Sequence, residues 1–204
     1  MHNSMSCAAR LLLSVSLLVP AFAQELQPID LPKPDTSGGR PLMQVLKERA
    51  TVREFRSERL PPQVLSNLLW AAFGINRPES GKRTAPSAVN RQEMDIYVAM
   101  KDGLYLYDAK GHRLQPVLAE DIRTLTGRDT FVREAPLNLI YVADFARMGS
   151  SSDQNKIFYS AADTGFISQN VYLYCASEGL GTVVRGGVDR NALQATMKLR
   201  PEQR

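Results

Sequence analysis

The feature that most constrains the fold of this 204-residue chain is one long segment, NKIFYSAADTGFISQNVYLYCASEGLG, which predicts a single helix from about Asn155 to Gly179. Its apolar and aromatic residues occupy more than one helical face, namely Ile157, Phe158, Phe166, Ile167, Val171, Tyr172, Leu173 and Tyr174. A helix that is apolar nearly all round is buried on all sides. One domain could bury it internally, but a dimer would do so more readily.

The first 23 residues predict the compartment. Arg10 precedes the apolar run LLLSVSLLV, Pro20 ends that run, and Ala21 and Ala23 form an A-x-A site. This combination is typical of a cleavable secretory signal, and the run is too short to span a bilayer as a mature helix. We therefore expect residues 1–23 to be a signal peptide and the mature protein to be periplasmic or secreted, with no membrane segment. The alternative is an apolar N-terminal helix of the fold.

The composition of the mature chain disfavours several kinds of chemistry. Only Cys175 and His112 would remain, so the chain could form no internal disulfide and has no credible ligand set for zinc or for a Cys/His pair. Cys175 lies in an apolar helical stretch and is interpreted as a small core residue rather than a catalytic thiol. The net charge is +4, without a run of Lys and Arg interleaved with aromatic residues. Nucleic acid is therefore a disfavoured partner.

Residues 24–41 are rich in proline and predict an extended leader, and residues 42–204 predict one domain. Helical patterns cover PLMQVLKERA, SERLPPQVLSNLLWAAFGINR, VLAEDIRTLTG and DRNALQATMKL. Strand patterns cover MDIYVAM and LYLYD as a hairpin around Lys101-Asp102-Gly103, and then APLNLIYVAD and TVVRGGVD. Helices and strands follow one another in no simple alternation, which indicates an α+β fold.

A first candidate for ligand binding is ERATVREF, which follows the first helical pattern. Arg49 and Arg53 flank Thr51, so two guanidiniums and a hydroxyl could converge on a phosphate. By itself such a run is more often a solvated helix end.

A second candidate is RTAPSAVNRQ. Pro86 fixes one backbone dihedral, Ser87 and Asn90 supply short hydrogen-bonding side chains, and Ala88 leaves room beside them. These properties suit close contact with a planar polar ligand. An ordinary connecting loop is the simpler alternative.

A third candidate is GLGTVVRGG. Gly186 and Gly187 follow an apolar run and leave bare backbone, whose N–H groups could meet a ligand oxygen or ring nitrogen. The alternative is a plain turn.

Taken together, these segments resemble the nitroreductase-like flavoproteins, and among them the group related to azoline-forming dehydrogenases. The resemblance is carried by RATVREF, LLWAAFGINR, RTAPSAVNRQ, DIYVA, GLYLYD, FVREAPLNLIYVAD, SQNVYLYCASEGLGTVVRGG and MKLRPEQ. These segments span about residues 42–203 in the order of the family. The resemblance implies an α+β fold in which helices flank a mixed, largely antiparallel sheet, in an interlocked homodimer. It also implies a further strand after RPEQ, where this sequence ends.

The resemblance further implies a bound FMN at the dimer interface. Its phosphate and ribityl end would be held by Arg49, Thr51 and Arg53. The isoalloxazine edge would be lined from the second chain by Pro86, Ser87, Ala88 and Asn90. Backbone near flavin N5 and O4 would come from Arg185, Gly186 and Gly187. No catalytic side chain is required, because the flavin carries the chemistry.

The function implied by the resemblance is that of an FMN-dependent oxidoreductase. Hydride would pass through flavin N5 to or from a small organic substrate such as a nitroaromatic or a quinone. The family uses NADH or NADPH, whereas the donor outside the cytoplasm is left open. The alternatives are a flavin-binding or flavin-handling protein without a second substrate, and a degenerate member without catalysis.

Overall fold

The structure is a computed structural model that describes residues 25–204, so the predicted signal peptide lies outside the described residues. The helices are α1 (Leu42–Glu48), α2 (Pro62–Phe73), α3 (Phe131–Glu134), α4 (Asp153–Ser177) and α5 (Arg190–Thr196), with short 3-10 turns η1 (Ala88–Asn90), η2 (Arg123–Thr126) and η3 (Phe145–Met148). In the described part of the chain, no helix is long and apolar enough to cross a membrane.

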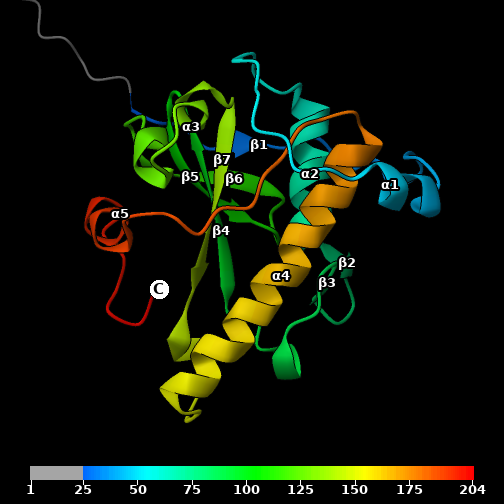
Figure 1. The fold of residues 1–204 in the computed structure, drawn as a ribbon. Helices are drawn as coiled ribbons and strands as arrows, with labels where there is room; N and C mark the ends of the chain where they lie inside the picture. Colours follow the sequence, from blue (N-terminus) through cyan, green and yellow to red (C-terminus); the bar gives the residue numbers. More distant parts are fainter. Residues whose placement is uncertain (1–24) are drawn as a thin grey trace, which may run out of the picture.

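One five-stranded sheet forms the centre of the fold (Figure 1). Its strands, in spatial order, are β1 (Ile29–Asp30), β6 (Arg113–Leu118), β5 (Gly103–Asp108), β4 (Met94–Met100) and β7 (Leu137–Ala143). All neighbours pair antiparallel, so the sheet is wholly antiparallel over the described residues rather than mixed. The expected hairpin at Lys101-Asp102-Gly103 joins β4 to β5. A separate ribbon pairs β2 (Ile75–Arg77) with β3 (Lys82–Arg83).

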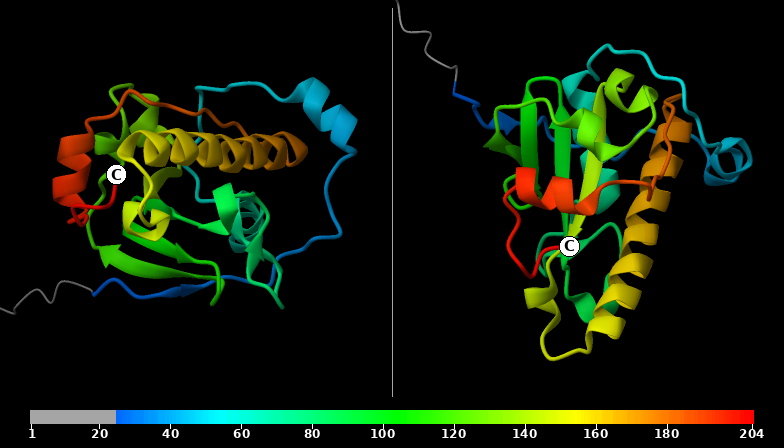
Figure 2. Two further views of the ribbon diagram at one scale, coloured as in Figure 1. Left: turned by 90° about the horizontal axis from the view of Figure 1, so that it is seen from below. Right: turned by 60° about the vertical axis from the view of Figure 1, so that its left-hand side comes forward.

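Strand β4 is covered on both faces, which explains its nearly continuous apolar sequence. Ile96 and Val98 face a core shared with α2 and α4, while Tyr97 and Ala99 face a second core shared with α5. Side chains alternate between the two faces of a strand, so both cores come from one seven-residue strand. Figures 1 and 2 show α4 and α5 on opposite sides of the sheet.

Helix α2 begins and ends as its sequence predicts. Pro62 occupies the first helical position, where its missing N–H is harmless. Gly74 follows the last turn, and a Cβ there would lie 2.5 Å from a Trp70 side-chain atom. Glycine at this position is therefore required by close packing.

The long helix α4 buries only one face within the described chain. Its inward residues are Ser160, Asp163, Ile167, Ser168, Val171 and Cys175, a stripe with helical spacing that packs against α2, α1 and β4. On the outer side, Ile157, Phe158 and Phe166 are 61%, 65% and 48% exposed. The expected burial on all sides is thus not achieved by one copy of the chain.

Two predicted elements are wrong. The segment TVVRGGVD contains no strand: residues 182–187 form an extended connection between α4 and α5. A single backbone hydrogen bond, from Val52 N–H to the Thr182 carbonyl, joins it to another described segment, which is too few for a β-ladder. The segment VLAEDIRTLTG is not a helix, because Val117 and Leu118 end β6 and only η2 precedes Gly127.

The leader runs along α2 and adds β1 to the edge of the sheet beside β6. A chain of hydrogen bonds fastens it. The Tyr107 hydroxyl can donate to His112 Nδ1 (3.0 Å), His112 Nε2–H to Ser66 Oγ (2.7 Å), and Ser66 Oγ–H to the Pro32 carbonyl (2.6 Å). Every donor and acceptor is satisfied only when His112 is neutral with its proton on Nε2. Burial lowers the pKa of His112, and the Pro32 backbone opposes this only in part.

We predict that the leader clamp makes folding stability fall in mild acid. Because the folded state lowers the pKa of His112, the unfolded chain binds the proton more readily below about pH 6.5, and the stabilisation is lost as the pH falls further. His112→Asn is the comparison, since Asn tolerates the left-handed backbone at this position (φ 47°). The difference in unfolding free energy between wild type and variant, measured in urea at pH 7.5 and 5.5, should shrink at pH 5.5. A constant difference would contradict the prediction.

Candidate functional site

Two of the three predicted segments lie side by side. Helix α1 ends at Glu48 with Arg49 as its C-cap, and the residues after it run along the connection that follows α4. Val52 N–H donates to the Thr182 carbonyl at 3.0 Å. A Cβ on Gly181 would lie 2.9 Å from Val52 Cγ1, so glycine there permits the close approach.

Tyr172 of α4 joins these two segments. Its hydroxyl accepts from Val184 N–H at 3.1 Å and lies 3.0 Å from Thr51 Oγ1, to which it can donate. The Arg49 guanidinium stacks over the Tyr172 ring, 5.1 Å from its centroid. From the sequence, Tyr172 is predicted only as one of the apolar and aromatic residues of the long helix. The sequence signal for its role is that this position carries a tyrosine and not a phenylalanine, because the hydroxyl of a half-buried tyrosine needs hydrogen-bond partners.

The two arginines of the first segment keep their charges available. Within residues 25–204, neither Arg49 nor Arg53 takes part in an ion pair, and Thr51 and Arg53 are exposed. Two uncompensated guanidiniums beside a hydroxyl create a local positive potential. This is the charge that an anionic group such as a phosphate would require.

Arg185 has a different role from the other two arginines. Its guanidinium turns inward and donates to the Thr126 carbonyl (2.6 Å) and to Asn138 Oδ1 (2.8 Å). Burial lowers the pKa of Arg185, with partial compensation from Asp129. A Cβ on Gly127 would collide with this guanidinium, which explains the glycine after η2. Arg185 therefore anchors the connection to the sheet and leaves only its backbone at the candidate site.

Gly186 and Gly187 follow this anchor and are exposed. Neither has a positive φ, and a Cβ built on either would meet no described atom within 4 Å. The local turn therefore does not require glycine at these positions. The space beside them is where a ligand could approach the backbone N–H groups.

The loop with Pro86, Ser87, Ala88 and Asn90 lies elsewhere. Ala88 N–H donates to Asp163 Oδ2 at 3.0 Å, nine residues before Tyr172 on α4. At about 1.5 Å per residue, this is a separation of about 13 Å along the helix. Over residues 25–204, no hydrogen bond joins this loop to either of the other segments. One copy of the chain thus presents two separate parts of the candidate site.

The loop is held in an unusual backbone conformation. Val89, Asn90 and Gln92 have φ values of 56°, 55° and 49°, although none is glycine. The left-handed region is unfavourable for a β-branched residue such as Val89, whose side chain is 87% exposed. Ser87 Oγ accepts from Gln92 N–H at 2.9 Å and closes the loop.

Sequence reasoning missed two buried acids behind this loop. Glu93 has no exposed surface and Asp163 is 2% exposed. The signal for Asp163 was its position on the inward stripe of α4, four residues before Ile167. Cys175, by contrast, is buried as predicted, and burial raises the pKa of its thiol to about 12, so it carries no thiolate at neutral pH.

The family model of the nitroreductase family matches residues 46–204. The chain belongs to the nitroreductase family. A nitroreductase-like protein of Methanocaldococcus jannaschii is 32% identical over 169 residues, covering 78% of this chain and 85% of that protein.

Solved structures of the nitroreductase family give the same result. A crystal structure of a nitroreductase-like protein from Ralstonia eutropha has 44% identity and a TM-score of 0.84, over 90% of this chain and 88% of that one. A family member from Desulfovibrio desulfuricans, solved in complex with FMN, has 20% identity and a TM-score of 0.58, over 81% of each chain. At that identity the similarity concerns the fold alone. The resemblance stated from the sequence is confirmed, as is an α+β fold with a mainly antiparallel sheet.

The open backbone at Gly186 predicts that a nitroreductase-family chain tolerates a side chain there. Gly186→Ala should change the unfolding free energy of flavin-free protein by less than about 1 kcal/mol, because no strain is introduced. Gly181→Ala is the matched control, and it should lose about 1–3 kcal/mol through overpacking against Val52. Urea unfolding of both variants measures the difference. Equal losses would mean that Gly186 serves the fold.

Proposed function

We propose that this protein is an FMN-dependent oxidoreductase that exchanges hydride equivalents with a small organic substrate such as a quinone or a nitroaromatic. The observation that carries the proposal is that Tyr172 contacts both the segment after α1 and the connection after α4. It holds Thr51 and the Arg49 guanidinium next to the connection that ends in open backbone at Gly186 and Gly187, and the exposed Arg53 follows two residues after Thr51. Membership of the nitroreductase family and the FMN-bound relative of the same fold support it.

In this proposal, the two segments hold opposite ends of one FMN. Arg49, Thr51 and Arg53 bind the phosphate and the ribityl end, because guanidiniums and a hydroxyl match phosphate oxygens. Bound FMN supplies the redox chemistry. The chain supplies N–H groups at Gly186 and Gly187, which stabilise negative charge at the edge of the ring.

The anchoring of Arg185 gives these N–H groups a fixed position. Its bonds to Thr126 and Asn138 tie the connection to β7 at the residue before the glycines. Preorganised donors stabilise developing charge more effectively than mobile ones, because they need no reorganisation during the reaction. In this scheme, Arg185 is a positioning residue and its guanidinium does not touch the flavin.

We further propose a homodimer in which the loop around η1 from one copy completes the site of the other. The loop and the phosphate-binding segment are separate within one protomer, so a second copy is the simplest way to combine them. The exposed apolar residues of α1 and α4 offer the interface: Leu42, Met43, Leu46, Ile157, Phe158 and Phe166. Helices α1 and α4 contact each other, and large apolar side chains left exposed on them favour an interaction surface.

We also propose that the protein is exported, on the basis of the predicted signal in residues 1–23. The nicotinamide donors of the family are scarce outside the cytoplasm. An exported member would then take electrons from another donor or pass them to oxygen. Several electron donors are therefore compared in the test that follows.

The proposed function is tested with purified protein to which FMN is added. We expect a bound-flavin absorbance spectrum, bleaching by dithionite, NADH or NADPH, and recovery of the colour on adding a quinone or nitroaromatic. Sedimentation of the same sample should give a dimer. Binding without turnover would favour the flavin-handling alternative, and no binding would favour a member without flavin.

The phosphate assignment predicts a difference between two flavins. Arg53→Ala should weaken FMN binding by about 1.5–3 kcal/mol, the range of a charge-assisted hydrogen bond, and leave riboflavin binding nearly unchanged. Arg56→Ala, which removes an exposed arginine three residues further along, is the matched control. Fluorescence titration of both flavins gives the dissociation constants. Equal losses for FMN and riboflavin would refute the assignment.

A further inference from the structure

Glu93 and Asp163 bring two carboxyl groups together in the interior behind the loop around η1. Glu93 immediately precedes β4 and has no exposed surface. Neither of its carboxyl oxygens has a hydrogen-bond partner among the described residues when the group is treated as ionised. Asp163 comes from the inward face of α4 and is 2% exposed. A buried carboxylate without a donor would be very costly, so the ionised form of Glu93 is not the stable one.

A single proton resolves this arrangement. Burial is the main cause that raises the pKa of Glu93. The adjacent Asp163 raises it further through a hydrogen bond and its charge, while the Glu93 backbone and, to a lesser extent, Ser160 oppose the rise. Two neighbouring buried carboxyls cannot both ionise at neutral pH. A neutral Glu93 can donate its O–H to Asp163, whose other contact is Ala88 N–H at 3.0 Å. The Asp163 carboxylate then has a donor from each side.

The loop that Asp163 holds needs such support. Three residues, Val89, Asn90 and Gln92, are in the left-handed region, and each such strained residue costs on the order of 1 kcal/mol or more. Strain of this kind persists only where surrounding contacts fix the backbone. The hydrogen bond from Ala88 to Asp163 ties the loop to α4 directly before the strained residues.

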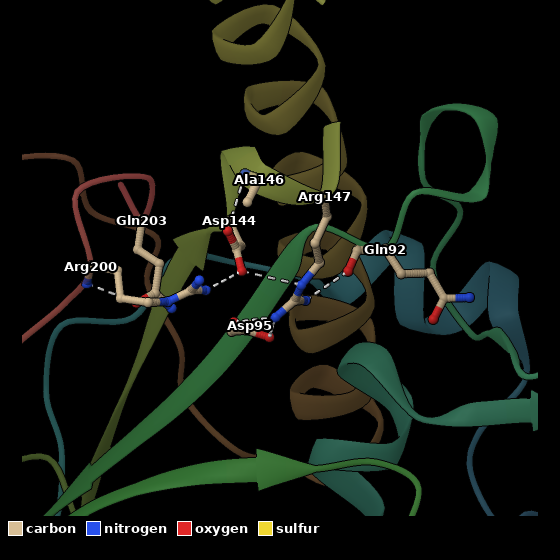
Figure 3. A network of polar contacts seen from close by, with 7 residues as sticks. All are labelled: Gln92, Asp95, Asp144, Ala146, Arg147, Arg200 and Gln203. Atoms are coloured by element: carbon tan, nitrogen blue, oxygen red, sulfur yellow. Dashed lines mark hydrogen bonds and ion pairs between the residues drawn. The ribbon is translucent and has the colours of Figure 1, made fainter. Parts of the chain in front are cut away.

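The end of the loop is fixed separately from the outside (Figure 3). Arg147 of η3 donates to the Gln92 carbonyl at 3.0 Å and to both carboxylate oxygens of Asp95 at 2.8 and 2.7 Å. Asp144 pairs with Arg147 and Arg200, and its N–H donates to the Glu93 carbonyl at 2.9 Å. These charged groups already have partners among themselves, which leaves the inner acids to support the front of the loop.

We propose that Glu93 and Asp163 share one proton, and that this proton fixes the loop Pro86–Asn90 in the conformation that lines the flavin ring. The inference rests on the proposed function for the identity of the ligand. When the proton is lost at high pH, two adjacent buried carboxylates repel each other and Asp163 no longer holds Ala88 N–H in place. Both acids are positioning residues, because they act through the loop backbone and not on the flavin.

The direction of the pH dependence follows from this assignment. A carboxyl whose pKa is raised in the folded protein stabilises the fold fully only below its unfolded-state pKa, and the stabilisation falls as the pH rises toward the folded-state pKa. Within the folded protein, the proton itself leaves only as the pH rises through the folded-state pKa, and the loop loses its support there. Flavin affinity should therefore fall as the medium becomes alkaline. FMN and riboflavin should lose affinity equally, because the loop contacts the ring they share and not the phosphate.

The test compares wild type with Glu93→Gln between pH 6.5 and 9. Glutamine keeps a donor toward Asp163 but cannot ionise. We expect wild-type affinity for both flavins to fall at least fivefold over this range, and the affinity of Glu93→Gln to stay within twofold of its value at pH 6.5. Asp153→Asn, on an exposed position of the same helix, is the matched control and should follow wild type. A Glu93→Gln profile that follows wild type would overturn the proposal.

A second measurement does not depend on flavin. Amide hydrogen exchange of the loop peptide in flavin-free protein, corrected for the intrinsic pH dependence of exchange, should show protection of Ala88 that is lost at pH 9 in wild type and kept in Glu93→Gln. Asp163→Asn, which still offers an acceptor to Ala88, should also keep it and serves if the first variant folds poorly. If flavin does not bind but Ala88 protection is lost at pH 9 in wild type and kept in the variants, the proposed function fails and the shared proton still explains how the loop is held. Unchanged protection of Ala88 from pH 6.5 to 9 in wild type would refute the proposal that a shared proton fixes the loop.

Discussion

The packing of α4 against β4 and α2 is the constraint on which the other features of the candidate site depend. Its inward stripe buries Ile167 and Val171 in the main core and so fixes both the rotation and the axial position of the helix. Once these are fixed, Asp163 meets the loop around η1 and Tyr172 meets the segments on either side of it. Both parts of the candidate site are therefore positioned by the apolar burial of one helix.

The sequence predicted those elements whose patterns are local and strong. Helices α2 and α4, the β4–β5 hairpin and β7 follow from apolar spacing and from Gly74 and Gly103. Strand β6 was missed because Pro116 and polar residues interrupt its pattern, although pairing with β5 on one side and β1 on the other still makes it a strand. TVVRGGVD has a strand-like sequence, but among residues 25–204 it pairs with no strand, so tertiary context overrides propensity.

The same distinction applies to the candidate site. Short motifs could name Arg49, Thr51 and Arg53 as a group, because their spacing is local. The inward turn of Arg185 could not be foreseen, since its partners Thr126 and Asn138 are brought to it by η2 and β7. Glu93 and Asp163 were invisible for a similar reason: they are 70 residues apart in the sequence, and each alone resembles an ordinary surface acid.

A shared proton has a physical advantage over an ion pair at the Glu93 position. An arginine or lysine opposite Asp163 would need space and several further acceptors, and besides apolar residues and Asp163 itself the buried stripe of α4 offers the hydroxyls of Ser160 and Ser168. A carboxylic acid supplies one short donor without adding charge, so the net charge of the buried pair is a single negative one. Ala88 N–H donates a hydrogen bond to this negative charge, so the strained loop helps to stabilise the buried carboxylate. Removing the loop from Asp163 would leave the carboxylate short of a donor, so burial of the acids and strain in the loop stabilise each other.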